Sequence, residues 1–435
     1  MMFVKKLFRP AQGLFLVLAL ATSAVAQEAS QSEPKPVPPS SEELEEVIVT
    51  APRRTEPDRP PPATTVVERD PALEDLIRSR LAQLESKLDV DASLSLAYTY
   101  NLINPEVRRG GNRGRLVDGD HNTFSLPYAR IGFGKSLSGL DELDAGFRID
   151  VAAGRLVQEA YADDGLFGSS SGQPINVTQA YLELQVPTRL GFGPLSVRAG
   201  RQASYFGVEG YDPTRNVNFS LSPVATFMPK TLTGLSLGLE LAPGLRYTQW
   251  VGNGWNKVVD NNDAKSVGGQ LSLELADAGL TMSANWILGA ERFDSSHDKR
   301  WAVELAMGWQ ATDSTLFKAS LLYGQEQFDD DYAKFSGVVG IVQQGFFKVD
   351  GEDFNRLSLA VRGSYLNDDG GALTGRDQTL AEVTGTVELR LLAQAALRVE
   401  YRHDWSSEAA FLGHEGTSGS RDEQDTIALE LNISF

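Results

Sequence analysis

The last ten residues of the chain, 426–435, read TIALELNISF, and their side chains alternate between polar and apolar. One face carries the apolar side chains of Ile427, Leu429, Leu431, Ile433 and Phe435. A repeat of two residues is that of a β-strand, in which successive side chains point to opposite faces of the sheet. The segment therefore predicts a strand with one apolar face and one polar face.

The same alternation recurs upstream, in segments 143–151, 301–309, 356–365, 381–391 and 397–405. A soluble sandwich would bury the apolar faces, whereas a membrane barrel would turn them toward lipid and line its lumen with the polar faces. Strand candidates of ten residues or more exceed the usual five or six, which favours the barrel. Aromatic side chains near strand ends, as in an interfacial girdle, favour it too: Tyr98, Tyr100, Tyr323, Tyr365, Trp405 and Phe435.

Short and long connections also alternate along the chain. Tight turns are expected at 136–139, 189–193, 243–244, 277–279, 313–314 and 393–394, and long polar loops at 103–120, 155–174, 206–229, 253–264, 327–334, 367–377 and 406–423. Short periplasmic turns and long extracellular loops are typical of outer-membrane barrels. We therefore predict an all-β fold, a transmembrane antiparallel β-barrel of about sixteen strands over residues 91–435. Fourteen to eighteen strands stay open, because Gly337 to Val342 alternates poorly.

Three further segments precede the predicted barrel. Residues 1–26 combine Lys5, Lys6 and Arg9 with an apolar run and an Ala24-Val25-Ala26 cleavage site, which indicates a signal peptide; an uncleaved membrane anchor is the alternative. Residues 27–70 are rich in Pro, Glu and Ser and predict a disordered tether in the periplasm. Residues 71–90 carry leucines at helical spacing and predict a short amphipathic helix. That helix could form a trimeric coiled coil, or it could lie against or inside the barrel mouth.

Composition excludes several kinds of site. The chain has no cysteine, which rules out disulfides and thiolate metal sites. The four histidines are far apart in sequence, so a helical HExxH zinc motif is impossible. A net charge of −18 argues against nucleic acid as a partner and would lean weakly toward cations in a pore. We expect no cofactor and no metal. We also expect no enzymatic activity, because His403 and Asp404 fall on opposite faces of one strand and cannot join in one catalytic site.

The polar faces supply candidates for the pore lining. Mixed charges occur at Arg356, Arg362, Glu382, Glu388, Arg390, Arg398, Glu400, Arg402, Asp404 and Glu430. They could form an eyelet with facing basic and acidic walls, or they could be cross-strand pairs that stabilise a hydrated wall. The 206–229 loop is long enough to fold inward as a constriction, or it could be a plain external loop. Its constriction candidates are Glu209, Asp212, Arg215, Asn216 and Asn218.

Two family resemblances follow from local motifs. Gly200-Arg201, Phe206-Gly207-Val208-Glu209, residues 216–220, residues 229–234 and Val251-Gly252-Asn253-Gly254-Trp255, with Asp260-Asn261-Asn262 and Lys265-Ser266, resemble the OmpL-like β-barrel porin-2 family. This resemblance implies a porin-type barrel and transfers no substrate or catalytic residue. Separately, Glu45, Glu46, Val47, Ile48, Val49 and Thr50 are similar to the TonB box of energised receptors, but no plug domain follows them. The box is either a remnant or chance pattern, or it recruits the energy-transducing complex to a small barrel.

Together these patterns predict an outer-membrane porin for passive diffusion of small hydrophilic solutes or ions. Two alternatives are a TonB-coupled or otherwise energised small receptor and a structural or adhesive barrel with a blocked lumen. Expected partners are outer-membrane lipid and lipopolysaccharide, the barrel assembly machinery through the terminal Phe435, TonB in the energised alternative, and two further copies of the chain in a homotrimer. The sequence leaves trimer and monomer open.

Overall fold

The computed structural model describes residues 88–435, except 139–141, 161–174, 189–191, 294 and 416–419. The predicted signal peptide, the tether, the TonB-like segment and residues 71–87 of the predicted helix lie outside this part of the chain. No helix among the described residues is long and apolar enough to cross a membrane.

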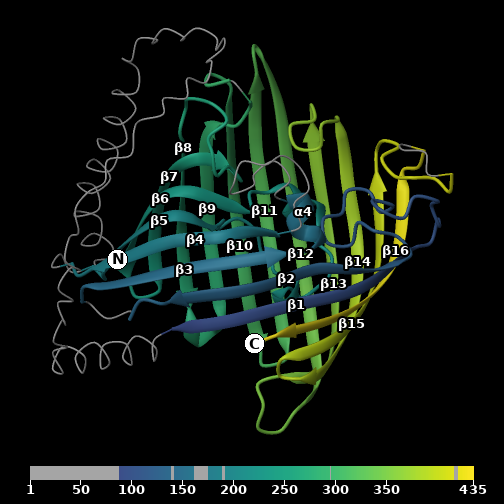
Figure 1. Ribbon diagram of the computed structural model, residues 1–435, viewed down its shortest axis with the longest axis horizontal. Coiled ribbons are helices and arrows are strands. Elements are labelled where there is room, and N and C mark those ends of the chain that lie inside the picture. The colour runs from purple at the N-terminus through teal and green to yellow at the C-terminus, as the bar shows by residue number, and fades with distance from the viewer. Residues whose placement is uncertain (1–87, 139–141, 161–174, 189–191, 294, 416–419) are drawn as a thin grey trace, which may run out of the picture. The chain divides into compact units, whose positions relative to one another are not determined.

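The described chain forms one closed barrel of sixteen antiparallel strands, which confirms the predicted fold (Figure 1). Each strand pairs with its neighbours in sequence, and β1 closes the barrel against β16, with Ser93 opposite Ser434 and Asn101 opposite Thr426. The strands are β1 (Asp89–Asn101), β2 (Thr123–Lys135), β3 (Asp144–Ala153), β4 (Ile175–Val186), β5 (Leu195–Ala203), β6 (Thr231–Ala242), β7 (Leu245–Trp255), β8 (Ser266–Leu275), β9 (Leu280–Ala290), β10 (Lys299–Thr312), β11 (Thr315–Phe328), β12 (Asp331–Lys348), β13 (Asn355–Asp369), β14 (Gln378–Leu392), β15 (Ala395–Ser406) and β16 (Glu423–Ser434).

Among the described residues, four short helical segments lie in the connections. They are α4 (Arg155–Ala160), the 3-10 turn η1 (Pro213–Arg215), α5 (Pro223–Phe227) and the 3-10 turn η2 (Ala276–Ala278). Both η1 and α5 lie in the connection between β5 and β6, which also carries the predicted constriction candidates.

The barrel wall is apolar outside and polar inside. In β16, Ile427 is 44% exposed on the outer face, whereas Glu430 on the inner face is 0% exposed. The same inversion holds at Leu305 and Leu321, which are exposed on the outer faces of β10 and β11. An apolar outer surface is what contact with lipid chains requires. The alternation of the last ten residues therefore has the predicted structural meaning.

Connections at one end of the barrel are short, and most at the other end are long. The short connections are residues 136–143, 187–194, 243–244, 276–279, 313–314, 349–354 and 393–394. The start of β1 and the end of β16 lie at the same end of the barrel. One predicted loop is wrong: residues 327–334 form a tight hairpin in which Phe328 pairs with Asp331. Asp329 adopts a φ of 54°, a left-handed conformation that aspartate tolerates, so the acidic run makes a turn and not a loop.

One strand boundary differs from expectation, and one doubtful segment proves to be part of a strand. β1 begins at Asp89, so Asp89 and Val90 belong to the barrel and not to the predicted helix. The poorly alternating residues 337–342 lie within β12, the longest strand at 18 residues among those described. Their inner face is apolar because Val339 and Ile341 belong to a buried hydrophobic cluster inside the barrel. The polar-apolar alternation is lost there because the inner face of β12 packs against protein and not against water.

Candidate functional site

The connection between β5 and β6, residues 204–230, folds into the barrel; we call it the internal loop. Phe219, Ser220 and Ser222 at its centre are 0% exposed. Its two helical turns are set by the local sequence, because Asp212 caps η1 and Ser222 caps α5, each followed directly by a proline. Of the two predicted arrangements for 206–229, the structure therefore shows the inward one.

The start of the internal loop contacts the β10–β11 wall. The backbone N–H of Gly207 donates to Glu304 Oε2 of β10 at 2.8 Å, and Asn285 of β9 donates to the same oxygen at 2.9 Å. Lys318 Nζ of β11 donates to the carbonyl of Val208 at 3.2 Å. The loop thus leaves β5, crosses toward these strands and then turns to the β13–β16 wall.

The middle of the internal loop is held by β15 through its main chain. The Glu400 carboxylate accepts hydrogen bonds from the N–H groups of Phe219 (2.8 Å) and Ser220 (3.0 Å). Arg398 donates to the carbonyls of Pro213 (3.0 Å) and Asn216 (2.8 Å). Arg402 donates to the carbonyl of Leu221 at 2.5 Å. Charged partners make these hydrogen bonds stronger than neutral ones.

A buried ion-pair network on β13 and β14 continues this anchor. Arg362 Nη1 lies 2.7 Å from Glu209 Oε1 of the internal loop, and its Nε lies 2.8 Å from Glu382 Oε1. Arg362 also donates to the carbonyl and hydroxyl of Ser220. The guanidinium is completely buried, so each of its contacts acts at low dielectric, and losing a carboxylate partner would leave a buried charge.

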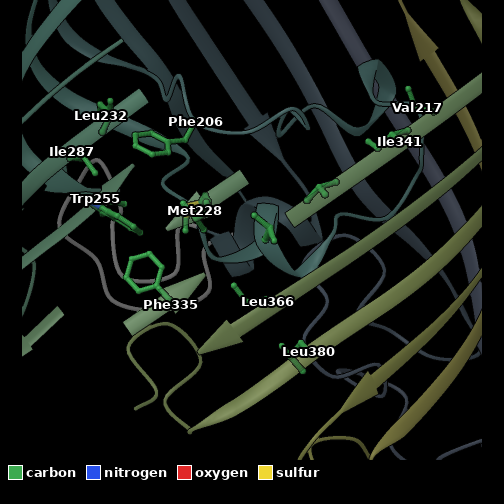
Figure 2. Close-up of a cluster of buried hydrophobic side chains, with 14 of the residues drawn as sticks. Phe206, Val217, Met228, Leu232, Trp255, Ile287, Phe335, Ile341, Leu366 and Leu380 are labelled. Carbon is green, nitrogen blue, oxygen red and sulfur yellow. The ribbon is translucent and has the colours of Figure 1, made fainter. Parts of the chain in front are cut away.

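Apolar side chains fix the second half of the internal loop. Met228 lies in a buried cluster with Phe206, Trp255 and Phe335, as Figure 2 shows. Val224 of α5 belongs to the same cluster, and its Cγ2 lies so close to Gly337 that a Cβ there would approach it to 2.7 Å. The glycine on β12 therefore leaves space for the helix to dock.

Lys230 closes the internal loop. Its buried ammonium donates to the carbonyls of Thr226 and Met228 near the end of α5, and it lies 5.2 Å from the ring centre of Tyr211. Burial lowers the pKa of Lys230 to about 7. The backbone N–H of Lys230 donates to Asn256 Oδ1, which ties the loop to the next connection, 256–265.

A second buried titratable group, Glu291, lies at the start of the connection 291–298 and contacts the end of β7. Glu291 accepts hydrogen bonds from the backbone N–H of Trp255 and the hydroxyl of Ser266, both at 2.7 Å. Burial raises the pKa of Glu291 to about 7, against the lowering effect of these donors. Trp255, part of the Asn-Gly-Trp motif, also lies 5.0 Å from the Arg300 guanidinium. The motif thus joins the connection 256–265, which follows it directly, to Glu291 of the connection 291–298.

The predicted pore-lining residues fall into two groups. Arg356 and Arg390 lie at the short-turn end, where they donate to carbonyls of residues 390, 391 and 393. The other eight face inward and are buried: Arg362, Glu382, Glu388, Arg398, Glu400, Arg402, Asp404 and Glu430. They contact the internal loop, one another, or Arg115 of the connection 102–122, which pairs with Asp404 and Asp118. The protein covers their charges.

The constriction candidates are spread along the internal loop. Glu209 pairs with Arg362, and Asp212 accepts from Ser93 Oγ at 2.7 Å. Asn216 braces the loop through Gly210, and Asn218 donates to Thr386 Oγ1 at 2.7 Å. Arg215 is the exception, with a side chain 63% exposed.

Open space lies on the opposite side of the internal loop from the β13–β16 wall. A first hollow of about 550 Å³ lies between Gly207-Val208 and the inner faces of β6 to β11, and includes Arg246 and Lys318. A second hollow of about 470 Å³ lies between the loop and β1 to β5, with Asp91, Arg130, Arg148 and Asp150 in its wall. Sequence reasoning did not name these as pore-lining residues, although the alternation of 143–151 already placed Arg148 and Asp150 on a polar face.

Metal-binding geometry is absent from the part of the chain that the structure describes. No group of three or more His, Asp or Glu side chains there is arranged to hold an ion. In the acid-rich connection 256–265, Asp260 is an ion-pair partner of Lys265.

Comparison with known proteins identifies the barrel type. The model of a family described as "Putative beta-barrel porin-2, OmpL-like" matches residues 87–435. The outer membrane channel DcaP of Acinetobacter baumannii is 12% identical, with a TM-score of 0.52 over 80% of this chain and 97% of that one. OprB of Pseudomonas putida is 11% identical, with a TM-score of 0.51 over 83% and 97%. These two similarities show the fold alone. No curated protein matches the chain.

Proposed function

Because the chain belongs to the OmpL-like β-barrel porin-2 family, we propose that it is a narrow outer-membrane porin through which small hydrophilic solutes and ions diffuse passively beside the internal loop. The family resemblance seen in the sequence is thereby confirmed, and so is a porin function. The path of the solute, past the first and second hollows, is the new part of the proposal.

One observation carries this path: the internal loop is bound to one wall and leaves space at the other. Charged groups of β13 to β15 hold its main chain from Pro213 to Leu221. Across the barrel, both hollows are bordered by the segment 206–212 and by polar side chains of β1 to β11. Polar walls keep water continuous, which passive diffusion of hydrophilic solutes requires.

Planar-bilayer recording of the purified full-length protein tests the pore. We expect ohmic conductance steps that are smaller than those of a porin without an inserted loop. A protein that inserts into the bilayer, shown by heat-shifted gel mobility after reconstitution, but gives no conductance would contradict the proposal. Such a result would favour the blocked-lumen alternative.

The assignment as a channel includes no catalytic step. On the outer wall, His403 Nδ1 lies 2.7 Å from Asp425 Oδ1, and Tyr401 donates to the same oxygen at 2.6 Å. Among the described residues no serine hydroxyl donates to His403; Ser406 donates to Gln378. These contacts provide hydrogen-bond partners for the Asp425 carboxylate, and they activate no nucleophile.

The location in the outer membrane follows from the family, and the finer assembly is proposed. We propose that residues 27–70 tether the chain in the periplasm, and that the exposed Phe435, joined to β1 through Ala92, is read by the barrel assembly machinery. Contact with lipopolysaccharide at the long-loop end and binding of TonB by residues 45–50 stay predictions. Deleting 45–50 and measuring solute uptake tests the latter, because unchanged uptake would contradict it.

A homotrimer is also proposed, on the outer wall around β1 to β3. Small side chains, Ala92 and Ala129, form a shallow apolar hollow beside Ile131 and Phe435. A second copy could fill it with larger side chains. Ala129→Trp should abolish a trimer band on unheated gels, whereas Ala319→Trp, on the outer face of β11, should leave it; a band unaffected by both would contradict this interface.

A further inference from the structure

We infer that the open side of the lumen favours anions, even though the chain carries a net charge of −18. The inference rests on the proposed pore and names the class of solute that passes it most readily. It reverses the weak cation preference that net charge alone suggests. The preference depends on which member of each ion pair faces the second hollow.

Every carboxylate in the wall of the second hollow is matched by an arginine. Asp91 contacts Arg130 and Arg148, Asp150 contacts the same two arginines, and Asp212 lies 3.4 Å from Arg130 Nε. The fourth carboxylate, Glu209, is bound by Arg362 from the opposite wall at 2.7 Å. A carboxylate already paired with a guanidinium offers little attraction to a passing cation.

Arg215, the arginine that reaches furthest into the water, is more exposed than both of its carboxylate partners. Arg215, at the tip of η1, is 63% exposed, whereas its partners Asp91 and Asp212 are 19% and 13% exposed. Arg148 is more exposed than Asp150, which lies 2.5 Å away, and as exposed as its other partner, Asp91. Arg130 is buried and links the three aspartates from behind. A solute in the second hollow therefore meets the guanidinium of Arg215 rather than its carboxylate partners, and the remaining aspartates are paired with Arg130 and Arg148.

Neighbouring groups extend the positive surface. Arg198 of β5 is 34% exposed, against 13% for Glu183, and lies 4.3 Å above the ring of Tyr181, which lines the second hollow. In the first hollow, Arg246 donates to Ser196 and Lys318 to the Val208 carbonyl, so both cations are bound to neutral oxygens. Glu240 and Glu274 also border the first hollow and oppose these cations, so we place the selectivity in the second hollow.

Several exposed acidic side chains lie on connections that do not line the second hollow. Asp329, Asp330 and Asp331 lie at an exposed hairpin tip, and Glu408, Asp422 and Glu423 lie on the connection 407–422 or at its edge. Charges in water are screened beyond about 8 Å at physiological salt. The net charge of the chain is therefore a poor guide to the field that a solute experiences.

A reversal-potential measurement across a planar bilayer tests this inference. With a KCl gradient and the full-length protein, we expect chloride to be more permeant than potassium. Arg215→Gln should lower the chloride-to-potassium permeability ratio by about tenfold, because one unit charge acting through water at about 6 Å changes the local concentration of each ion by about threefold, in opposite directions for the two ions. Because Arg215 is exposed, the substitution should leave folding intact, and gel mobility checks this.

The matched control is Arg421→Gln, which removes an exposed arginine from the 407–422 connection and should leave the ratio unchanged. A wild-type channel that prefers potassium would overturn the inference while leaving the pore itself established. An Arg215→Gln ratio equal to that of the control would also overturn it. Absence of any conductance would instead count against the proposed function, so the two failures are distinguishable.

Discussion

Replacing Glu400 with glutamine should loosen the internal loop. The carboxylate accepts two backbone N–H groups, from Phe219 and Ser220, and the hydroxyl of Thr386, all within 3.0 Å. A glutamine side chain has one acceptor oxygen, and its NH₂ group would face at least one N–H donor. The substitution therefore removes a charge-assisted hydrogen bond and leaves a buried backbone donor without an acceptor.

We expect this change to cost the anchored state about 2 kcal/mol, the middle of the range for hydrogen bonds to charged groups. That cost raises the population of the released loop about 30-fold, since 1.4 kcal/mol is a factor of ten. Amide hydrogen exchange of Phe219 and Ser220 should quicken by a similar factor. In planar bilayers, the variant should show noisier current and larger conductance sublevels, because the loop would leave the β15 wall more often.

Glu423→Gln is the matched control, since Glu423 is exposed at the start of β16 and the loss of charge is the same. It should leave both exchange and current noise at wild-type values. The reasoning would be refuted if Phe219 and Ser220 in Glu400→Gln exchanged at the wild-type rate in a correctly folded barrel. Equal effects of the two substitutions would show that net charge, and not the anchor, controls the loop.

Three further predictions concern the same network and its surroundings. Arg362→Met should destabilise the barrel by about 3–5 kcal/mol, because Glu209 and Glu382 would lose their shared buried partner; chemical denaturation followed by tryptophan fluorescence measures this, and a loss below about 1 kcal/mol would contradict it. Lys230, with its pKa lowered from 10.5 to about 7, binds fewer protons in the folded state between these values, so its contribution to stability rises with pH across that window. Lys230→Met should remove that rise, and an unchanged pH profile of the thermal midpoint would show that Lys230 is not its source. The pKa of Glu291 is raised from 4.5 to about 7, so its contribution to folding stability is complete below about pH 4.5 and is lost as pH rises through 7. Glu291→Gln should flatten that part of the pH profile of the thermal midpoint, and a slope retained in the variant would show that Glu291 is not its source.

Sequence periodicity predicted the barrel well because each membrane-spanning strand has the same two solvents on its faces. Lipid outside and polar surroundings inside produce the alternation seen at Ile427 and Glu430. The rule failed at 337–342, where Val339 and Ile341 face inward against a buried apolar cluster. It also misjudged 327–334, because an acidic run is equally compatible with a loop and with a tight turn at Asp329.

The site was less accessible to sequence reasoning than the fold. Alternation correctly placed Arg362, Arg398 and Glu400 on the inner face, but an inner face is not necessarily a wet one. Whether such a charge meets solute or protein depends on contacts such as Arg398 to the Asn216 carbonyl, which join residues 182 positions apart. Periodicity along one strand carries no information about such a contact. For the same reason, it could not distinguish Arg130 and Arg148 beside open space from arginines under the loop.

The wall of β13 to β15 recognises the internal loop mainly by its backbone, through the N–H groups of Phe219 and Ser220 and the carbonyls of Pro213, Asn216, Ser220 and Leu221. Main-chain groups are the same whatever side chain they carry. Substitutions at a loop position that is exposed to the lumen, such as Arg215, can therefore change the ion selectivity of the channel without breaking the hydrogen bonds that hold the loop. The same side chains of β13 to β15 could thus hold other loops of equal length and different side-chain chemistry, either in diverged relatives or in designed variants.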